Sequence, residues 1–410
     1  MSIRWITPLL GTGPALQVHQ EADMNIIDVR DLVDKAGNRA DAVRQKISEG
    51  CDSLRAGKKT VVCCDYGISR SNAVAVGILA MHESISFETA VRRVLEATGE
   101  KEIKADPLQA VRRAIGGGKR GIAHEKIRVL VTGGAGFLGE PVSRKLAEGF
   151  EVVAPGREQL DLKQGSTQLD LLVGEKEVDC ILHLANPRVY TSNIALGDTL
   201  TMLRNVLDVC VARDIKLIYL SSWEVYSGYR ANCLYADESL PLLPKGPYAE
   251  TKFLCEMLIE HCRRTQGLRC TMLRSSPVYG IGSDKPKFIY NFIDKIKQSK
   301  RIVTHRYNNG SPALDLLYID DLVSAVSKAV GSDFVGNLNI GTGMVTSTQR
   351  IAEMLNNLLG GKSEIDATLI DSDTAGIAMD ARKAQLVLGW KPTIDIEQGL
   401  QLILSDLQTK

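Results

Sequence analysis

Short apolar runs alternate with longer amphipathic stretches along this chain. Residues 59–64, 126–131 and 216–222 are rich in Val, Ile, Leu and Cys, as expected of strands buried on both faces. Stretches that suit helices follow such runs, for example at residues 72–81. This alternation predicts an α/β fold built on largely parallel sheets.

The periodic pattern breaks once, near the end of the first third of the chain. Residues 116–121 read Gly-Gly-Gly-Lys-Arg-Gly and continue neither a strand nor a helix. A chain of 410 residues with 44% hydrophobic side chains is long enough for two cores. We therefore expect a domain at residues 1–115, a linker at 116–125 and a second domain at 126–410.

Charge and cysteine content narrow the possible partners. The formal net charge is +1, from 50 basic and 49 acidic side chains, so we expect neither nucleic acid nor a membrane as a partner. The chain lacks an apolar run of 18 residues and a leader-like N-terminus, which favours a soluble, cytoplasmic protein. The nine cysteines do not have zinc-site spacing, and no metal is predicted.

A glycine-rich turn follows the strand predicted over residues 126–131. Glycines at 133, 136 and 139 give the spacing G-x-x-G-x-x-G, directly before a helix pattern. Such glycines let the backbone turn sharply and approach a pyrophosphate, although an ordinary strand-to-helix turn is the alternative. We predict a dinucleotide site formed by Gly133, Gly136, Phe137, Leu138 and Gly139.

Three polar residues further along can move a proton. Ser222 ends the strand predicted over residues 216–222, at the end where parallel sheets bind ligands. Tyr248 and Lys252 are four residues apart on a predicted helix and therefore share one face. A nearby ammonium favours the tyrosinate, so Tyr248 can act as an acid or base near neutral pH. Lys252 can also hold a nicotinamide ribose, while Ser222 hydrogen-bonds a substrate oxygen.

Residues 126–410 resemble the extended short-chain dehydrogenase/reductases, specifically the NAD-dependent epimerase/dehydratase group. The resemblance rests on the glycine turn, the Y-x-x-x-K motif and four later segments in the same order: LRSSPVYG at 273–280, LYIDDL at 317–322, NIGTG at 339–343 and LGWKP at 388–392. It implies a Rossmann fold, a doubly wound parallel sheet with a smaller C-terminal substrate lobe. It also implies hydride transfer between a nucleotide-sugar and the nicotinamide of NAD or NADP, and a homodimer.

The resemblance places further residues at the cofactor. Arg157 follows the second strand, where NAD-preferring sites carry an acid, and a basic residue there can hold a 2′-phosphate. We therefore favour NADP over NAD, with a solvated surface arginine as the alternative. Asp161 would contact the adenine and Ala185 the nicotinamide side. His183 is expected to be a buried core histidine rather than a catalyst.

Two departures from the family leave the reaction (epimerase, dehydratase or reductase) and the exact substrate open. Glu224 occupies the place of a glutamate in 4,6-dehydratases and UDP-glucuronate decarboxylases, but Trp223 replaces the second dehydratase acid. Glu224 is therefore either a base at a sugar carbon or an acid at a helix start. Leu314 replaces an arginine that often binds the nucleotide pyrophosphate, with Arg306 and Lys287 as candidate substitutes.

A second chemical motif lies in the first domain. Cys64 ends a predicted strand and Arg70 opens a helix, which gives C-x5-R followed by Ser71. N–H groups of such a loop point inward, and the arginine can grip two oxygens of a phosphorylated substrate. The same field lowers the pKa of Cys64 and makes it a nucleophile. Ser71 is placed to ease departure of the sulfur from a phosphocysteine intermediate.

Residues 1–115 resemble a small dual-specificity or protein-tyrosine-phosphatase domain on this motif. The resemblance implies a general acid from an earlier loop, for which Asp31 matches and Asp34 is the second choice. Cys63 replaces the family's usual histidine, and Asp65 adds an acid where basic residues would favour inositides. An active phosphatase is the first interpretation, and a phosphate-binding pseudophosphatase is the alternative.

The two motifs together predict a bifunctional enzyme, a cysteine phosphatase fused to an NAD(P)-dependent nucleotide-sugar epimerase, dehydratase or reductase. A regulatory protein that binds both ligands without turnover is the rival interpretation.

Overall fold

The computed structural model describes residues 3–18, 23–35, 37–115, 126–187, 192–282 and 286–409. These residues form two compact units. Unit 1 comprises Met1–Arg128, Arg157–Asp179 and Thr201–Ile215, and unit 2 comprises Val129–Gly156, Cys180–Leu200 and Lys216–Lys410. The linker predicted at 116–125 lies outside the described residues, and the domain boundaries that adjoin it stay predictions.

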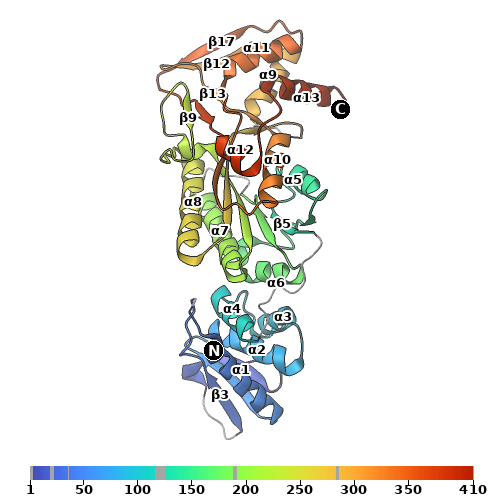
Figure 1. Ribbon diagram of the computed structural model, residues 1–410, viewed down its shortest axis with the longest axis vertical. Helices are drawn as coiled ribbons and strands as arrows, with labels where there is room; N and C mark the ends of the chain where they lie inside the picture. Colours follow the sequence, from blue (N-terminus) through green and yellow to red (C-terminus); the bar gives the residue numbers. More distant parts are fainter. Residues whose placement is uncertain are drawn as a thin grey trace. The chain divides into compact units, whose positions relative to one another are not determined.

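Unit 1 is built on a small sheet at the blue end of the chain (Figure 1). The strand order of this sheet is β1-β2-β4-β3. Its central strand β4 pairs in parallel with β2 and β3, and only the short edge strand β1 is antiparallel. Every residue of β4 after Lys59 is buried, which explains its apolar composition. The strands are β1 (Arg4–Trp5), β2 (Leu10–Pro14), β3 (Met24–Asp28) and β4 (Lys59–Cys64).

Helix α2 (Arg70–Glu83) runs through the core of unit 1. Its residues from Ser71 to Ala80 are all buried, so it is apolar on every side. Three amphipathic helices pack against it: α1 (Ala40–Arg55), α3 (Phe87–Thr98) and α4 (Ala105–Ala114). Unit 1 also includes η1 (Ala15–Gln17), η2 (Leu162–Gln164), α6 (Thr167–Glu175) and the C-terminal part of α7 (Asn193–Arg213).

Unit 2 contains a larger sheet with the order β15-β10-β8-β7-β5-β6. The strands β5, β7, β8, β10 and β15 pair in parallel. The chain passes from β5 outward to β6 and then returns to β7 on the other side of β5, which creates the switch point of a doubly wound fold. The strands are β5 (Arg128–Thr132), β6 (Glu151–Val153), β7 (Cys180–His183), β8 (Lys216–Ser222), β10 (Cys270–Ser275) and β15 (Gly336–Ile340).

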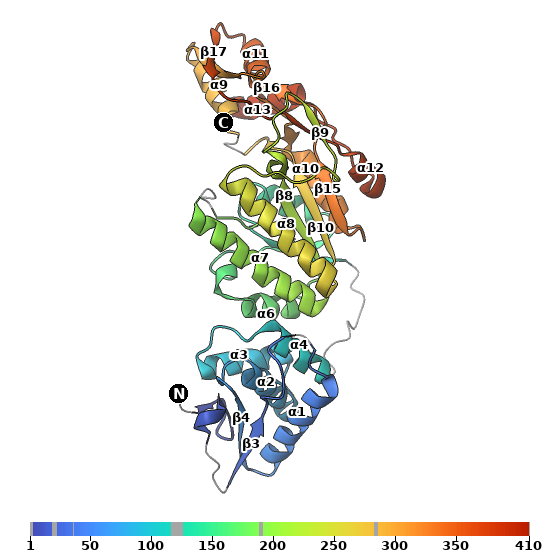
Figure 2. The ribbon, with the colours of Figure 1, turned by 90° about the vertical axis from the view of Figure 1, so that its left-hand side faces the viewer.

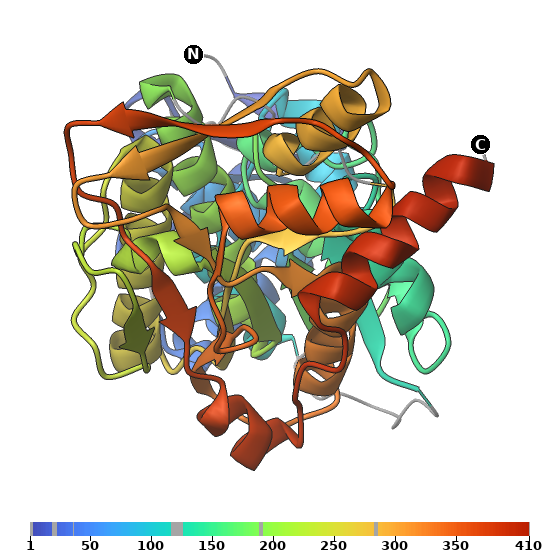
Figure 3. The same ribbon diagram turned by 90° about the horizontal axis from the view of Figure 1, so that it is seen from above.

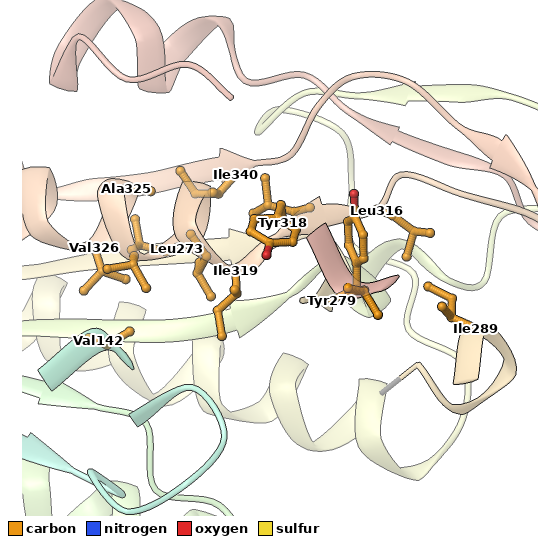
Figure 4. Packing of buried hydrophobic residues seen from close by; sticks show 14 of the residues in the cluster. Val142, Leu273, Tyr279, Ile289, Leu316, Tyr318, Ile319, Ala325, Val326 and Ile340 are labelled. Atoms are coloured by element: carbon orange, nitrogen blue, oxygen red, sulfur yellow. The ribbon is translucent and has the colours of Figure 1, made fainter. Parts of the chain in front are cut away.

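Helix α8 (Pro247–Gln266) lies along β8 and β10 (Figure 2). On the other side of the sheet, α10 (Ile319–Val330) packs with α5 (Gly139–Leu146), and Val142, Leu273, Ile319 and Val326 belong to their shared core (Figure 4). Burying this core stabilises the sheet by roughly 25 cal/mol for each Å² of apolar surface removed from water. The sheet therefore gives a rigid base for the loops at its strand ends.

The C-terminal lobe consists of small strand pairs and helices. Strands β12 (Ile302–Tyr307) and β17 (Ile365–Ile370) pair in parallel, and α11 (Thr348–Leu358) packs alongside them (Figure 3). The other pairs are β11 (Val278–Tyr279) with β14 (Leu317–Tyr318), β13 (Ala313–Leu314) with β16 (Thr346–Ser347), and β9 (Leu234–Ala236) with β18 (Ile377–Met379). The remaining elements are η3 (Trp223–Tyr226), α9 (Lys287–Lys297), α12 (Arg382–Leu388) and α13 (Ile396–Thr409).

The expected α/β architecture with a doubly wound sheet is confirmed in unit 2. The assignment of the first domain to the cysteine phosphatases stays a prediction. Within the described part of the chain, no helix combines the length and the apolarity needed to cross a membrane.

Candidate functional site

The glycine turn forms a tight backbone cradle between β5 and α5. Gly133 has a φ of +73°, and a Cβ atom there would lie 2.8 Å from backbone atoms of Ala185. A Cβ atom on Gly139 would overlap the Gly133 carbonyl oxygen, and the same oxygen accepts a hydrogen bond from Gly136 N at 3.0 Å. Side chains at 133 and 139 would close this cradle, so the backbone fits a bound pyrophosphate.

The predicted neighbours of the cradle fall into two groups. Phe137 and Leu138 are half-buried against the core of unit 2, and Ala185 meets the turn through the contact with Gly133. Arg157 belongs to unit 1, where its largely exposed side chain lies 3.8 Å from Asp161. Asp161 also accepts a hydrogen bond from Lys163 N at the start of η2. The cofactor contacts of all these residues stay predictions.

Ser222 and Lys252 stand on adjoining elements. Ser222 ends β8, and its Oγ accepts a hydrogen bond from Glu224 N at 3.2 Å. Lys252 projects from α8, and its Nζ donates to the Leu220 carbonyl oxygen at 2.8 Å. The Nζ also lies 5.8 Å from the ring centre of Tyr248. This arrangement can supply a positive charge to a phenol beside the C-terminal end of β8.

Burial changes the acidity of the two charged groups near Ser222. Burial lowers the pKa of Lys252, although Cys255, Glu256 and Glu224 oppose this change. Burial raises the pKa of Glu224, although the Lys252 charge opposes this change. A raised pKa brings a glutamate closer to the range where it can accept and return a proton.

His183 lies in the core, as predicted. It is 2% exposed, its Nδ1 is hydrogen-bonded to Thr132 Oγ1 at 2.7 Å, and its ring stacks on Tyr219 with centres 6.0 Å apart. Burial, together with the Lys252 charge, lowers the pKa of His183 to about 3. The ring is therefore neutral at physiological pH and serves the packing between β5, β7 and β8.

This depressed pKa predicts an acid-sensitive stability. The neutral ring contributes its full stability above the unfolded pKa of about 6.5, and that stability is lost as pH falls toward the folded pKa of about 3. Between these values, the free energy of unfolding should fall by at most ~1.4 kcal/mol per pH unit. We expect the free energy of unfolding of His183→Gln, measured with urea, to fall less steeply between pH 7 and pH 4 than that of the wild-type protein. The exposed His82→Gln is the control, and equal slopes for His183→Gln and wild type would contradict the prediction.

Cys64 ends β4 inside a loop of inward-pointing donors. Its Sγ accepts a hydrogen bond from Gly67 N at 3.2 Å and lies 3.4 Å from Ser71 Oγ. Burial alone raises the pKa of Cys64, but hydrogen bonds from the Ser71 hydroxyl and from the N–H groups of Ser71, Gly67 and Tyr66 outweigh it, so the pKa is lowered. The loop therefore stabilises a thiolate.

Arg70 is held by carbonyl and carboxylate oxygens. Its Nη1 donates to the carbonyl oxygens of Leu32 at 2.9 Å and Arg30 at 3.3 Å, and its Nη2 donates to Asp65. Its Nε lies 3.7 Å from Asp34 Oδ1. Asp65 thus pairs with one nitrogen of the guanidinium, and the other two nitrogens lie near oxygens of Arg30, Leu32 and Asp34.

The two candidate general acids have different surroundings. Asp31, the first choice from the sequence, pairs with Lys46 at 3.4 Å and is largely exposed. Asp34, the second choice, lies beside Arg70 and pairs with Lys104 at 3.3 Å. Of the two candidate acids, Asp34 is therefore the one that the fold brings next to Arg70.

Leu314 and its two candidate substitutes, Arg306 and Lys287, lie in the C-terminal lobe. Leu314 is a half-buried residue of β13, next to the buried Asp315. Asp315 accepts hydrogen bonds from the backbone of Thr342 and Met379, so this segment anchors the lobe. Arg306 is an exposed residue of β12 and Lys287 an exposed residue at the start of α9.

Sequence reasoning missed Tyr219, which lies on β8 against Lys252. Lys252 Nζ donates to the Tyr219 hydroxyl at 3.3 Å. The available signal was a tyrosine within the apolar run Leu-Ile-Tyr-Leu, because a buried hydroxyl usually has a hydrogen-bond partner.

The chain is similar to known proteins over about two thirds of its length. Residues 129–341 match the NAD dependent epimerase/dehydratase family. A putative UDP-glucose 4-epimerase of Methanocaldococcus jannaschii is 30% identical over 312 residues, which cover 68% of this chain and 97% of the relative. UDP-glucuronic acid decarboxylase 1 of Danio rerio is 25% identical, over 67% of this chain and 71% of that protein.

A solved structure shows the same fold. The UDP-glucose 4-epimerase of Thermus thermophilus in complex with NAD superimposes with a TM-score of 0.60 at 23% identity, covering 69% of this chain and 99% of that one. The family match extends over more than half of the chain, and the archaeal relative is aligned over almost its whole length. The chain therefore belongs to the NAD dependent epimerase/dehydratase family.

Proposed function

We propose that the part of the chain from residue 126 onward catalyses 4-epimerisation of a UDP-hexose or UDP-hexuronate. The observation that carries this proposal is the buried Lys252 ammonium near the Tyr248 ring, beside the strand end that carries Ser222. The names of relatives support the substrate class, because they include UDP-glucose and UDP-glucuronate 4-epimerases. An epimerase needs one acid–base residue that works in both directions and requires no second acid at the place of Trp223.

Each residue of this site has a distinct task. A bound nicotinamide would supply reversible hydride transfer, and net epimerisation requires the hydride to return to the opposite face of the sugar carbon. The Lys252 ammonium stabilises the phenolate form of Tyr248, and this phenolate takes the proton of the sugar hydroxyl and becomes a neutral phenol. Ser222 donates a hydrogen bond to the reacting oxygen. The glycine cradle from Gly133 to Gly139 holds the pyrophosphate of the cofactor.

Glu224 separates this reaction from its closest alternatives. A dehydratase or decarboxylase would use the Glu224 carboxylate, with its raised pKa, as a base at the sugar. In an epimerase, Glu224→Gln keeps most of the activity, because Tyr248 alone carries the proton. In a dehydratase or decarboxylase, Glu224→Gln stops formation of the dehydrated or decarboxylated sugar.

The direct test is product analysis with purified protein. UDP-glucose, UDP-N-acetylglucosamine and UDP-glucuronic acid are incubated separately with NAD+ or NADP+, and the nucleotide-sugars are separated by chromatography and identified by NMR. We expect the C4 epimer of one substrate. A 4-keto-6-deoxy sugar or a pentose would replace the epimerase proposal with a dehydratase or decarboxylase.

Arg157 makes the choice of cofactor testable. The family supports NAD, and we propose that Arg157 adds affinity for the 2′-phosphate of NADP. Arg157→Ala should weaken NADP+ binding about tenfold and leave NAD+ binding unchanged, because an exposed charge-assisted bond to a phosphate contributes roughly 1.5 kcal/mol. Isothermal titration measures both affinities, with the exposed Arg350→Ala as the control. Equal losses for the two cofactors would reject a role at the 2′-phosphate.

We also propose that the part of unit 1 within residues 1–115 is a cysteine-dependent phosphatase. The lowered pKa of Cys64 and the donors around its sulfur support a thiolate that attacks phosphorus. Arg70 would hold the phosphoryl oxygens after release from Asp65, and Ser71 would stabilise the departing thiolate. Asp34, beside Arg70, is the better placed general acid than Asp31. A pseudophosphatase would bind phosphate here without turnover.

We further propose a homodimer that pairs through α8. Leu254 and Met257 are exposed on this helix, one turn apart, and would supply an apolar contact. Light scattering behind size-exclusion chromatography measures the mass in solution, and a monomer would exclude the proposal.

A further inference from the structure

Tyr219 is the buried partner of the lysine at the candidate active site. We propose that Tyr219 is a positioning residue, whose hydroxyl fixes the Lys252 ammonium in the orientation needed for Tyr248 and the cofactor. The inference rests on the proposed hydride-transfer function and adds a residue that the Ser222, Tyr248 and Lys252 set does not include.

The contact geometry restricts Lys252 on two sides. Its Nζ donates to the Tyr219 hydroxyl at 3.3 Å and to the Leu220 carbonyl oxygen at 2.8 Å. It also lies 4.8 Å from the centre of the Tyr219 ring. An ammonium has three N–H groups, and Lys252 makes no third hydrogen bond among the described residues. One N–H therefore stays free for a ribose hydroxyl or a phenolate.

Tyr219 is itself held in place. Burial raises the pKa of Tyr219, and the neighbouring Cys255 thiol, about one turn along α8 from Lys252, raises it further, so the neutral hydroxyl presents an oxygen lone pair to the ammonium. Its ring stacks on His183, which is hydrogen-bonded to Thr132 immediately before the glycine turn. Tyr219 is 1% exposed and cannot turn away from these neighbours without opening the core.

The result is a continuous set of contacts from the cofactor cradle to the catalytic helix. Thr132 ends β5, His183 ends β7, Tyr219 lies in β8 and Lys252 lies in α8. Without Tyr219, the flexible Lys252 side chain would lose its rotational freedom at the moment when the cofactor binds, and this entropy loss would weaken binding. With Tyr219 present, that ordering is already complete, and Lys252 meets the ligand in one geometry.

Tyr219→Phe removes the hydroxyl and keeps the ring. We expect NAD+ affinity, measured by isothermal titration without substrate, to fall about tenfold because Lys252 loses a charge-assisted bond. We also expect the apparent pKa of Tyr248 to rise by about one pH unit, since the ammonium no longer stays near the phenolate. The pKa of Tyr248 is measured from the absorbance of tyrosinate as a function of pH. The titration of the matching protein that also carries Tyr248→Phe is subtracted, so that only the Tyr248 signal remains.

Three further variants separate positioning from general stability. Tyr279→Phe removes a buried hydroxyl that bonds the Asp395 carbonyl oxygen in another part of unit 2, and it should leave both readouts unchanged. Cys255→Ala should reproduce part of the loss expected for Tyr219→Phe. Cys255→Ser keeps a hydrogen-bond acceptor and should restore both readouts toward their wild-type values. These variants keep the inference testable if Tyr219→Phe does not fold.

The possible outcomes distinguish this inference from the proposed function. The positioning role would be overturned if Tyr219→Phe and Cys255→Ala both keep the NAD+ affinity and the Tyr248 pKa of the wild-type protein, even if the enzyme is active. A wild-type protein that binds no NAD+ or NADP+ would overturn the proposed function itself. A fall in melting temperature with both readouts unchanged would assign Tyr219 to the core alone.

Discussion

Tyr248→Phe should lower turnover of the UDP-sugar substrate about a thousandfold, because a positioned general acid–base residue contributes typically 10²–10⁴-fold. The phenylalanine ring fits the same space but cannot take the proton of the sugar hydroxyl. Lys252 stays in place through Tyr219 and Leu220, so cofactor affinity should change little. Steady-state kinetics with the identified UDP-sugar and titration with NAD+ measure the two effects.

The control for this experiment is Tyr235→Phe. Tyr235 is 70% exposed in β9, so loss of its hydroxyl should leave the rate unchanged. Residual epimerisation in Tyr248→Phe at more than a tenth of the wild-type rate would mean that another residue carries the proton. Absence of turnover in the wild-type protein with every sugar tested, together with normal NAD+ binding, would favour a regulatory protein that binds without catalysis.

Cys64→Ser should abolish hydrolysis of p-nitrophenyl phosphate, with a loss of at least about a thousandfold. A serine hydroxyl stays protonated near neutral pH, whereas the loop donors favour the Cys64 thiolate. The buried Cys51→Ser, outside the loop, is the control. Hydrolysis that persists in Cys64→Ser would exclude the thiolate mechanism, while phosphate binding without hydrolysis in the wild type would identify a pseudophosphatase.

The general acid of this reaction can be assigned in the same assay. Asp34→Asn should lower the rate about a hundredfold with phenyl phosphate, whose poor leaving group requires protonation, and less with p-nitrophenyl phosphate. Asp31→Asn removes a surface pair with Lys46 and should have little effect. The opposite ranking would restore Asp31 as the acid.

The buried strands and the glycine turn could be predicted from the sequence. The apolar runs at β4, β5 and β8 identify buried parallel strands, because buried strands of this kind need apolar residues on both faces. The glycine spacing identifies the cradle, because positions 133 and 139 cannot carry a Cβ atom. The composition of each strand, the positive φ of Gly133 and the overlap of a Cβ atom at Gly139 with Gly133 are all local in the chain.

Contacts between distant side chains could not be predicted in this way. The position of Tyr219 in β8 shows that its ring is buried, but the contact with Lys252 depends on how α8 crosses the strand. Asp31 and Asp34 are three residues apart on an irregular loop, so their spacing does not show which one faces Arg70. Such pairings arise from packing between elements, which sequence periodicity does not specify.

The ion pair between Asp65 and Arg70 has a consequence for any anion that enters the loop. Asp65 is tethered five residues from Arg70, so its effective concentration at the guanidinium is high, on the order of millimolar or more. A phosphate that binds Arg70 must therefore displace the Asp65 carboxylate, because the guanidinium is already paired. In the proposed phosphatase, the same carboxylate would displace the inorganic phosphate released by hydrolysis, which predicts weak product inhibition.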